Sequence, residues 1–225
     1  MPYYRTIANL NLYKSPALES LVTQAAIGRY LVPTAAVQPG QVIPVRLVED
    51  DYPGLLAPQD WQWVEPIETP YQAPQLTATE IRDRLPQVIA FTEAALQVPN
   101  TYLWGGTVAP NYDCSGLMQA AFHSVGIQLP RDAYQQEGFV QAIAIEQLEP
   151  GDLVFFGTPE KATHVALYLG DNCYIHSSGK DQGRNGIGID QLSAQGDEVS
   201  RRYYAQLRGA GRVVTSYQPS PSPPS

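Results

Sequence analysis

The residues best suited to chemistry in this chain are one cysteine and two histidines. Cys114 lies in the segment Asp113-Cys114-Ser115-Gly116, and apolar residues follow it at helical spacing as far as Val125. This pattern predicts a helix with one buried face. Asp113 is a good N-cap residue, so Cys114 falls in the first helical turn. The unpaired amides and the positive end of the helix dipole favour the thiolate there, and the thiolate is the nucleophilic form of cysteine.

A nucleophilic cysteine needs a base, and two of the three histidines lie downstream, at His164 and His176. Both flanks of Gly170-Asp171-Asn172 are rich in β-branched and aromatic residues, which predicts a β-hairpin. If the turn is centred on Gly170, the two histidines oppose each other directly, with Cβ atoms about 5 Å apart. His176 would then fix the tautomer of His164, as the acid does in a serine–histidine–aspartate triad.

Alternation along this hairpin separates a histidine face from an apolar face, and we expect the histidine face to be turned toward the helix of Cys114. Cys173 falls on the apolar face and is expected to be a small buried hydrophobe. A catalytic zinc ion held by Cys114, His164 and His176 is an alternative. No close-spaced ligand pair supports that alternative.

Several motifs follow one another in the C-terminal part of the chain, residues 78–214: Tyr102-x-Trp104-Gly-Gly, Asp113-Cys114-Ser115-Gly116, Leu129-Pro130-Arg131, Gly151-Asp152-Leu153-Val154-Phe155-Phe156, His164-Val165-Ala166 and Ile175-His176. In this set and this order they resemble the NlpC/P60 family of cysteine peptidases. The resemblance implies an α+β, papain-like catalytic domain. It also implies hydrolysis of murein stem peptides at the bond between γ-D-glutamate and a diamino acid such as diaminopimelate. The catalytic residues would be Cys114, His164 and His176, with no metal and no other cofactor.

Four further residues are candidates for substrate binding: Tyr52, Tyr102, Asp113 and Ser115. The Tyr102 hydroxyl and the backbone amide of Cys114 could stabilise an oxyanion, although core packing is an equal alternative for Tyr102. Asp113 could receive the ammonium group of an incoming peptide in addition to capping the helix, with Ser115 assisting. Arg131 could pair with a substrate carboxylate, but an arginine after a proline is more typical of a solvated surface.

Residues 1–65 are expected to form a small all-β domain that resembles a bacterial SH3-type barrel, with strands near 3–7, 28–32, 42–48 and 55–56. The prolines of residues 66–77 predict a semi-rigid linker, and Thr77-Ala78-Thr79-Glu80 fits a capping box. Pro86 predicts two short helices or a kink. The tail, residues 215–225, is rich in proline and serine and is expected to be disordered.

The N-terminal domain is expected to wall one end of the catalytic groove and so limit the substrate to short peptides. Tyr52, on the loop-like segment from Asp50 to Gly54, is the candidate for that contact. The alternative is a wall-targeting or merely structural domain.

The composition of the chain argues against some classes of binding partner. A formal net charge of −8 argues against a nucleic-acid surface and against a basic patch for anionic membranes. No stretch approaches the ~20 apolar residues of a transmembrane helix, and no protein partner is evident. The first residues lack the apolar core of a signal peptide, so we expect a cytoplasmic protein that acts on free L-Ala-γ-D-Glu-diamino acid fragments in cell-wall recycling. Two other classes stay open: a papain-like amidase or acyltransferase on a non-wall substrate, and a non-catalytic module that binds wall peptides.

Overall fold

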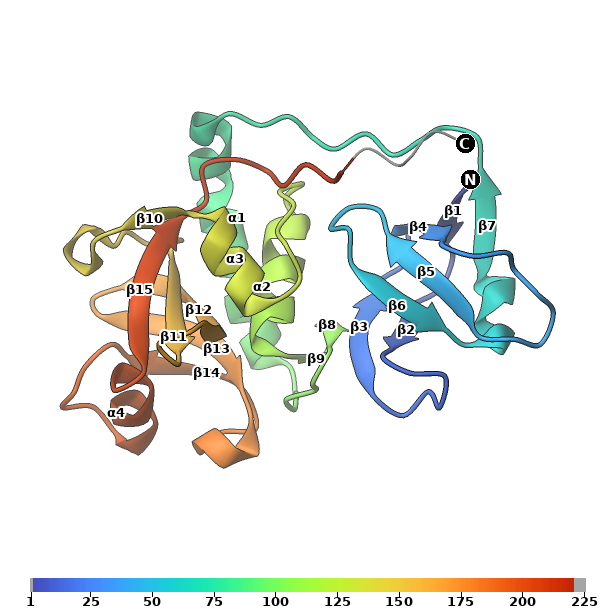
Figure 1. The fold of residues 1–225 in the computed structure, drawn as a ribbon. Coiled ribbons are helices and arrows are strands. Elements are labelled where there is room, and N and C mark those ends of the chain that lie inside the picture. The colour runs from blue at the N-terminus through green and yellow to red at the C-terminus, as the bar shows by residue number, and fades with distance from the viewer. Residues whose placement is uncertain (1, 221–225) are drawn as a thin grey trace.

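The computed structural model describes residues 2–220. Two halves lie side by side: an N-terminal half made of strands and a C-terminal half in which helices cover a sheet (Figure 1). One extended segment joins the halves along the upper edge of Figure 1, and the C-terminal segment runs beside it. The described residues therefore form two parts, one all-β and one of mixed helices and strands.

The N-terminal half is one antiparallel sheet of seven strands in the order β3-β2-β6-β5-β4-β1-β7. The strands are β1 (Tyr3–Thr6), β2 (Leu10–Tyr13), β3 (Leu21–Ala25), β4 (Tyr30–Pro33), β5 (Ile43–Leu47), β6 (Pro53–Leu56) and β7 (Val64–Ile67), with the 3-10 helix η1 (Pro58–Trp63) between the last two. Alternate residues such as Leu12, Leu31 and Leu47 are fully buried and form a core of their own. The four expected strands correspond to β1, β4, β5 and β6, whereas β2, β3 and β7 were not expected.

The hydrogen-bonded ladder of this sheet ends at β3 on one side and at β7 on the other. Within residues 2–220, the sheet is therefore not closed into the predicted barrel by its hydrogen bonds, although the half is all-β as expected. The SH3-type likeness stays a prediction. Edge strand β3 faces the C-terminal half, which the sequence predicts to be catalytic and which is called the catalytic half below. The strand lies beside the small hairpin of β8 (Thr107–Val108) and β9 (Asn111–Tyr112) (Figure 1).

The catalytic half begins with a long helix, α1 (Ala78–Gln97), that starts at the predicted capping box. Thr77 Oγ1 accepts from the Glu80 amide at 3.3 Å, and Glu80 Oε2 accepts from the Thr77 amide at 2.8 Å. The helix continues through Pro86, so the predicted division into two helices is wrong. Arg82, whose carbonyl loses its partner at the proline, is exposed like Pro86 itself, and solvent can therefore satisfy that carbonyl.

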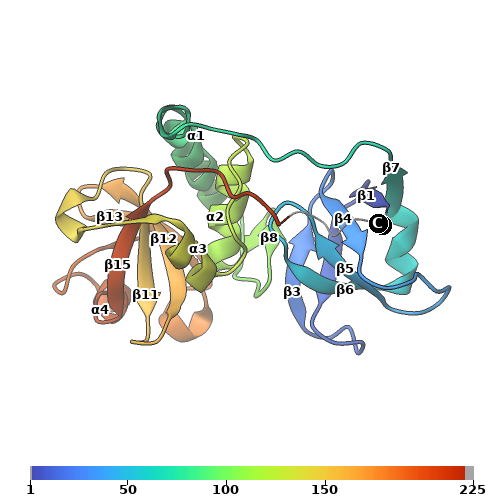
Figure 2. The same ribbon diagram turned by 45° about the horizontal axis from the view of Figure 1, so that its top comes forward.

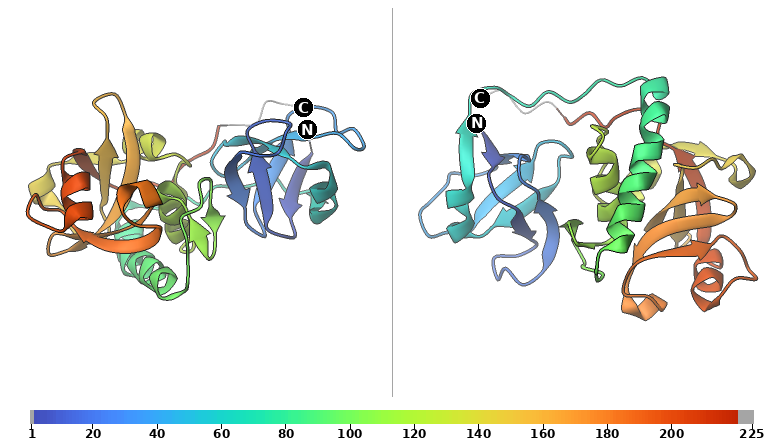
Figure 3. Two further views of the ribbon diagram at one scale, coloured as in Figure 1. Left: turned by 90° about the horizontal axis from the view of Figure 1, so that it is seen from below. Right: turned by 180° about the vertical axis from the view of Figure 1, so that it is seen from behind.

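A six-stranded antiparallel sheet forms the centre of the catalytic half, in the order β10-β15-β11-β12-β13-β14. The strands are β10 (Gln141–Ile143), β11 (Leu153–Gly157), β12 (Ala162–Gly170), β13 (Cys173–Ser178), β14 (Gly186–Gln191) and β15 (Leu207–Arg212). Helices α1, α2 (Cys114–His123) and α3 (Ala133–Phe139) cover one face, and α4 (Glu198–Tyr204) covers the other (Figure 3). Two 3-10 helices, η2 (Ile145–Gln147) and η3 (Lys180–Gln182), lie in connections. This is the expected α+β architecture.

None of the helices in residues 2–220 combines the length and the apolar character needed to cross a bilayer.

Residues 216–220, where disorder is expected, instead pack against both halves (Figure 2). The Tyr217 amide donates to the Gln128 carbonyl at 2.9 Å, and its hydroxyl donates to Asp51 Oδ2 at 3.3 Å. The Tyr217 ring also lies edge-on to Phe139, and the Ser220 amide donates to Asp51 at 2.6 Å. The segment thus ties the N-terminal sheet to the catalytic half. The rest of the predicted disordered tail, residues 221–225, lies outside the described residues.

Candidate active site

Helix α2 begins at Cys114, and Asp113 is its N-cap, as predicted. Asp113 Oδ1 accepts from the Gly116 amide at 2.7 Å. Position 116 requires glycine, because a Cβ there would lie 2.0 Å from the carbonyl oxygen of Gly106. This crossing of two backbone segments fixes the first turn of the helix and therefore the place of the thiol.

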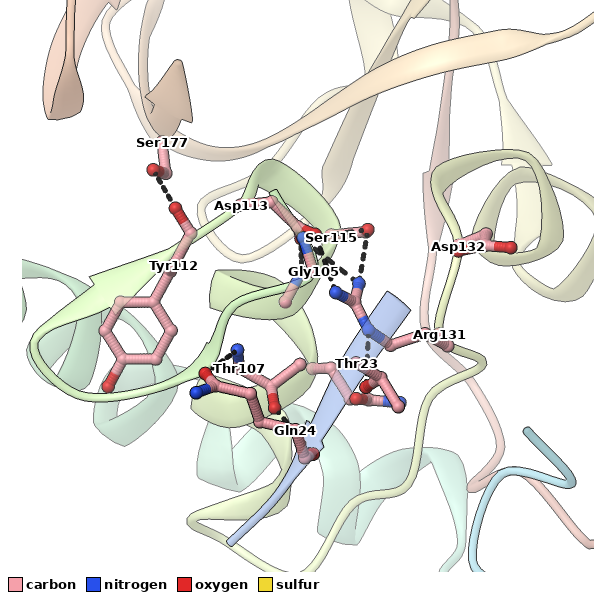
Figure 4. Close-up of polar contacts among 12 residues, drawn as sticks. Thr23, Gln24, Gly105, Thr107, Tyr112, Asp113, Ser115, Arg131, Asp132 and Ser177 are labelled. Atoms are coloured by element: carbon pink, nitrogen blue, oxygen red, sulfur yellow. Dashed lines mark hydrogen bonds and ion pairs between the residues drawn. The ribbon is translucent and has the colours of Figure 1, made fainter. Parts of the chain in front are cut away.

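Arg131 is buried behind this turn, with only 1% of its surface exposed, so the solvated surface position expected for it is wrong. Its Nη2 donates to Asp113 Oδ2 at 2.6 Å, and its Nη1 donates to Asp113 Oδ1 at 3.1 Å and to Ser115 Oγ at 3.0 Å (Figure 4). Asp113 Oδ2 also accepts from the Gly105 amide at 2.8 Å. Protein donors therefore surround the Asp113 carboxylate on both oxygens.

This arrangement argues against Asp113 as the receptor of a substrate ammonium group. A carboxylate offers about four lone-pair positions, and the Gly105 and Gly116 amides and the Arg131 guanidinium already occupy them. Ser115 is likewise held between Arg131 and Asp113. We conclude that both side chains position the start of α2.

His164 and His176 form the predicted hydrogen bond, with 2.7 Å between His164 Nε2 and His176 Nδ1. The register differs from the one expected. Tyr168 pairs with Tyr174, and the turn lies at Asp171-Asn172, where both residues have positive φ. The histidines are therefore diagonal neighbours, not directly opposed ones. A shift of two residues leaves every side chain on its original face, so the hydrogen bond survives the error in register.

The histidine face packs against α4, which contradicts the expectation that it is turned toward α2. The ring centroids of His164 and Tyr203, a residue of α4, lie 4.4 Å apart, whereas Val165 and Ile175 of the opposite face pack with the apolar side of α2. Cys114, in the first turn of α2, lies beside the strand that carries His164. The backbone amide of Val165, the residue after His164, hydrogen-bonds the sulfur.

Asp190 extends the pair of histidines into a hydrogen-bonded chain of three buried groups. The sequence analysis did not identify Asp190 as a site residue. His176 Nε2 lies 2.7 Å from Asp190 Oδ2, and Arg184 donates to both oxygens of the same carboxylate. A carboxylate at His176 Nε2 requires the proton on that nitrogen. His176 Nδ1 is then the acceptor for His164 Nε2, which leaves His164 Nδ1 outside this chain of hydrogen bonds.

The resting charges of the site follow from burial. Burial, followed by the Asp113 carboxylate, raises the pKa of the Cys114 thiol to about 12. Burial, followed by the neighbouring His176, holds the pKa of His164 well below its ordinary value of 6.5. Near neutral pH the pair is therefore a thiol beside a neutral imidazole. The helix dipole alone predicts a thiolate at rest, and burial of Cys114 reverses that expectation.

A groove of about 890 Å³ lies between the two halves, and Cys114 lines it. The four predicted substrate-binding residues all line this groove: Tyr52, Tyr102, Asp113 and Ser115. Burial, followed by Cys114 when it is ionised, raises the pKa of Tyr102. The Tyr102 hydroxyl is therefore a neutral hydrogen-bond donor in the groove that Cys114 also lines. Tyr52 enters from the N-terminal half, as expected for a residue that walls the groove.

Asp132 is a groove carboxylate that the sequence analysis did not identify. It is partly exposed, lines the groove, and accepts from the Tyr52 hydroxyl at 3.2 Å. Burial raises its pKa above the ordinary value of 3.8, against the opposing charge of Arg131. A signal was present in the sequence, because successive residues of an extended segment point in opposite directions. If Arg131 is buried, Asp132 faces the groove.

Comparison with known proteins identifies the family that most of the catalytic half resembles. Residues 99–208 match the model of the NlpC/P60 family, and this range contains Cys114, His164 and His176. Residues 99–208 therefore form an NlpC/P60 domain, as the motifs predict. The N-terminal half lies outside the match.

Curated relatives cover the same region. Dipeptidyl-peptidase 6 of Lysinibacillus sphaericus is 38% identical over 112 residues, which is 47% of this chain and 38% of that protein. Gamma-D-glutamyl-L-lysine dipeptidyl-peptidase of Bacillus cereus is 40% identical over 79 residues, which is 34% of this chain and 24% of that protein. The chain thus spans well under half the length of these relatives.

Solved structures agree on the fold. An NlpC/P60 family protein from Bacillus cereus superposes with a TM-score of 0.50 at 24% identity, over 95% of this chain and 63% of that one. The peptidoglycan hydrolase RipB from Mycobacterium tuberculosis also gives a TM-score of 0.50 at 24% identity, over 67% of this chain and 74% of that one. At this identity the likeness establishes the fold alone.

We predict that Asp190→Asn slows alkylation of Cys114 by iodoacetamide roughly tenfold near pH 7, which corresponds to about one pKa unit of lost stabilisation of the imidazolium. The thiolate forms by passing its proton to His164, and Asp190 raises the pKa of both histidines. Peptide mapping by mass spectrometry follows Cys114 separately from Cys173. The two proteins should be alkylated at the same rate at high pH, because the Cys114 thiol then loses its proton to solvent and does not need His164 as the base.

The matched control is Asp171→Asn. Asp171 lies in the turn of the same hairpin with positive φ, a conformation that asparagine adopts equally well. This variant should keep the wild-type profile. If Asp190→Asn also keeps it, then Asp190 does not act on the histidine pair.

Proposed function

We propose that this chain is a cysteine endopeptidase that hydrolyses the bond between γ-D-glutamate and a diamino acid in murein stem peptides. The observation that carries the proposal is the thiol of Cys114 beside the buried chain of His164, His176 and Asp190, in a groove between the two halves. The two curated relatives, a dipeptidyl-peptidase and a gamma-D-glutamyl-L-lysine dipeptidyl-peptidase, support a peptidase that acts near the amino end of a γ-D-glutamyl peptide.

In the first half of the reaction, the sulfur of Cys114 attacks the carbonyl carbon of the γ-glutamyl amide while its proton passes to His164. The C–N bond then breaks, and His164 gives that proton to the leaving amine of the diamino acid. The γ-glutamyl group remains on the sulfur as a thioester. His176 and Asp190 hold the imidazolium in place and stabilise its charge.

In the second half, water attacks the thioester with His164 as the base, which releases L-Ala-γ-D-Glu and restores the thiol. Both halves pass through an oxyanion that needs donors placed beforehand. The backbone amide of Cys114, in the first turn of α2, is one such donor. The Tyr102 hydroxyl is the second, because it is neutral and lines the groove beside the thiol.

The groove favours a peptide whose amino end is free. Asp132 and Tyr52 meet at the wall that the N-terminal half supplies, with the Tyr52 hydroxyl 3.2 Å from Asp132 Oδ1. A partly buried carboxylate gains most from a cationic partner. We propose that Asp132 receives the ammonium group of L-Ala, in the role that the sequence predicts for Asp113.

A free L-Ala ammonium occurs on stem peptides already released from the glycan strand. We therefore propose released fragments as the substrate and recycling of wall peptides as the role, in a cytoplasmic setting. The N-terminal sheet, proposed as SH3-like, would act as the wall that excludes longer substrates.

We predict that Cys114→Ala abolishes release of the diamino acid from L-Ala-γ-D-Glu-diaminopimelate, measured by mass spectrometry of the products. The fold should persist, because alanine suits a helix interior. Cys173→Ala is the matched control and should retain nearly wild-type turnover, since Cys173 lies at the start of β13 and does not line the groove. Wild-type turnover by the Cys114 variant would rule out this nucleophile.

We predict that the free tripeptide is cleaved with a kcat/KM roughly ten- to a hundredfold above that of its muramyl form, the range expected for one charged hydrogen-bonded pair. Acylation of L-Ala removes the ammonium group and leaves Asp132 without its partner. Equal kcat/KM for the two peptides would show that the N-terminal half does not select the free amine.

Asp132→Asn tests the residue responsible. Asparagine keeps the N-cap role of residue 132 at α3 and keeps its size, so the fold should be unaffected. The variant should lose most of its preference for the free tripeptide, chiefly through a higher KM. An unchanged preference would assign the ammonium group to another site.

A further inference from the structure

The edge strand of the N-terminal sheet lies directly behind the nucleophile helix. Thr23, in the middle of β3, is fully buried, and its hydroxyl oxygen accepts from Arg131 Nε at 2.9 Å. Figure 4 shows the hydroxyl and the guanidinium facing each other across the boundary between the halves. The two residues are 108 positions apart in the sequence.

This contact is the fourth side-chain hydrogen bond of Arg131. A guanidinium carries five N–H donors and no acceptor. Nη1 and Nη2 donate to Asp113 and Ser115, on either side of Cys114. Nε donates to Thr23. One hydroxyl of the N-terminal half is therefore linked through a single side chain to both neighbours of the nucleophile.

Two other residues of β3 contact the segment that leads into α2. Gln24 Oε1 accepts from the amides of Thr107 and Val108 at 3.1 and 3.2 Å, and the Gln24 carbonyl accepts from the Thr107 hydroxyl at 2.9 Å. Leu21 lies so close to Gly105 that a Cβ on the glycine would be 2.9 Å from its side chain. The Gly105 amide donates in turn to Asp113.

We propose that β3 of the N-terminal half positions the nucleophile, and that Thr23 is the positioning residue that does so through Arg131 and Asp113. This inference rests on the proposed role of Cys114. When Nε has no acceptor, a buried guanidinium shifts toward whatever acceptor it can reach, because an unpaired buried donor is costly. The geometry of its two hydrogen bonds to Asp113 then changes. Because Asp113 caps α2, the position of the first turn of α2 changes as well. The N-terminal half is therefore part of the active site as well as a wall of the groove.

The test is Thr23→Val, which removes the hydroxyl and keeps the shape of the side chain. We expect kcat for the free tripeptide and the rate of Cys114 alkylation both to fall roughly tenfold, the scale of a lost hydrogen bond to a charged group. KM should stay within about twofold, because Thr23 does not line the groove. Thr23→Ser keeps the hydroxyl and should restore both rates.

Thr6→Val is the matched control. Thr6 is a buried threonine of the same sheet, and its hydroxyl donates to the Ala26 carbonyl within the N-terminal half. It should lower the melting temperature about as much as Thr23→Val while leaving the alkylation rate unchanged. Equal alkylation rates in the two valine variants, or a serine variant as slow as the valine variant, would overturn the proposal.

A replacement variant and a readout that needs no peptide separate a failure of the positioning role from a failure of folding or of the proposed function. If Thr23→Val shows no cooperative melt, Thr23→Ala replaces it, because alanine removes the same hydroxyl without placing a methyl group against the guanidinium. Alkylation needs no peptide substrate. If the wild-type protein fails to cleave the tripeptide, the proposed function fails, while the alkylation contrast between Thr23→Val and Thr6→Val still decides the positioning role.

Discussion

The geometry of the nucleophile depends on one buried ion pair, Asp113 with Arg131. Removing both charges from water carries a large penalty that their attraction offsets only when the remaining hydrogen-bonding positions are filled. Here the partners come from separate segments: the Gly105 loop, the first turn of α2 at Gly116, and Thr23 of the N-terminal sheet. The pair is satisfied only when all these segments are in place. It therefore enforces the assembly of the site more than it stabilises the fold.

The chain of His164, His176 and Asp190 is likewise a set of buried polar groups that satisfy one another's hydrogen bonds. His164 and His176 are buried and uncharged at rest, and Asp190 is kept ionised by Arg184 and His176, with its pKa lowered to about 2. A charge appears on the imidazole only when the thiol gives up its proton. In a site of low polarity the fixed carboxylate then stabilises that charge strongly. The arrangement therefore favours a protonated cysteine at rest.

Local patterns in the sequence predicted the site better than they predicted the contacts between distant segments. The N-cap at Asp113 and the shared face of His164 and His176 depend on spacings of a few residues, and a register error of two left that face unchanged. The burial of Arg131 could not be read from its neighbours, because the Thr23 hydroxyl that completes it lies on a short strand with little hydrophobic alternation. Asp190 was missed for a similar reason, since its pairing required the register of one more strand.

Arg131 and Asp132 are neighbours in the chain, and their side chains serve different parts of the site. Arg131 points inward and holds the start of the nucleophile helix, while Asp132 points into the groove and meets Tyr52 of the other half. Because the two side chains share one stretch of backbone, a movement of the N-terminal sheet would disturb the start of α2 and the proposed ammonium site together. On that proposal, selection of the substrate's amino end and alignment of the thiol are not independent properties.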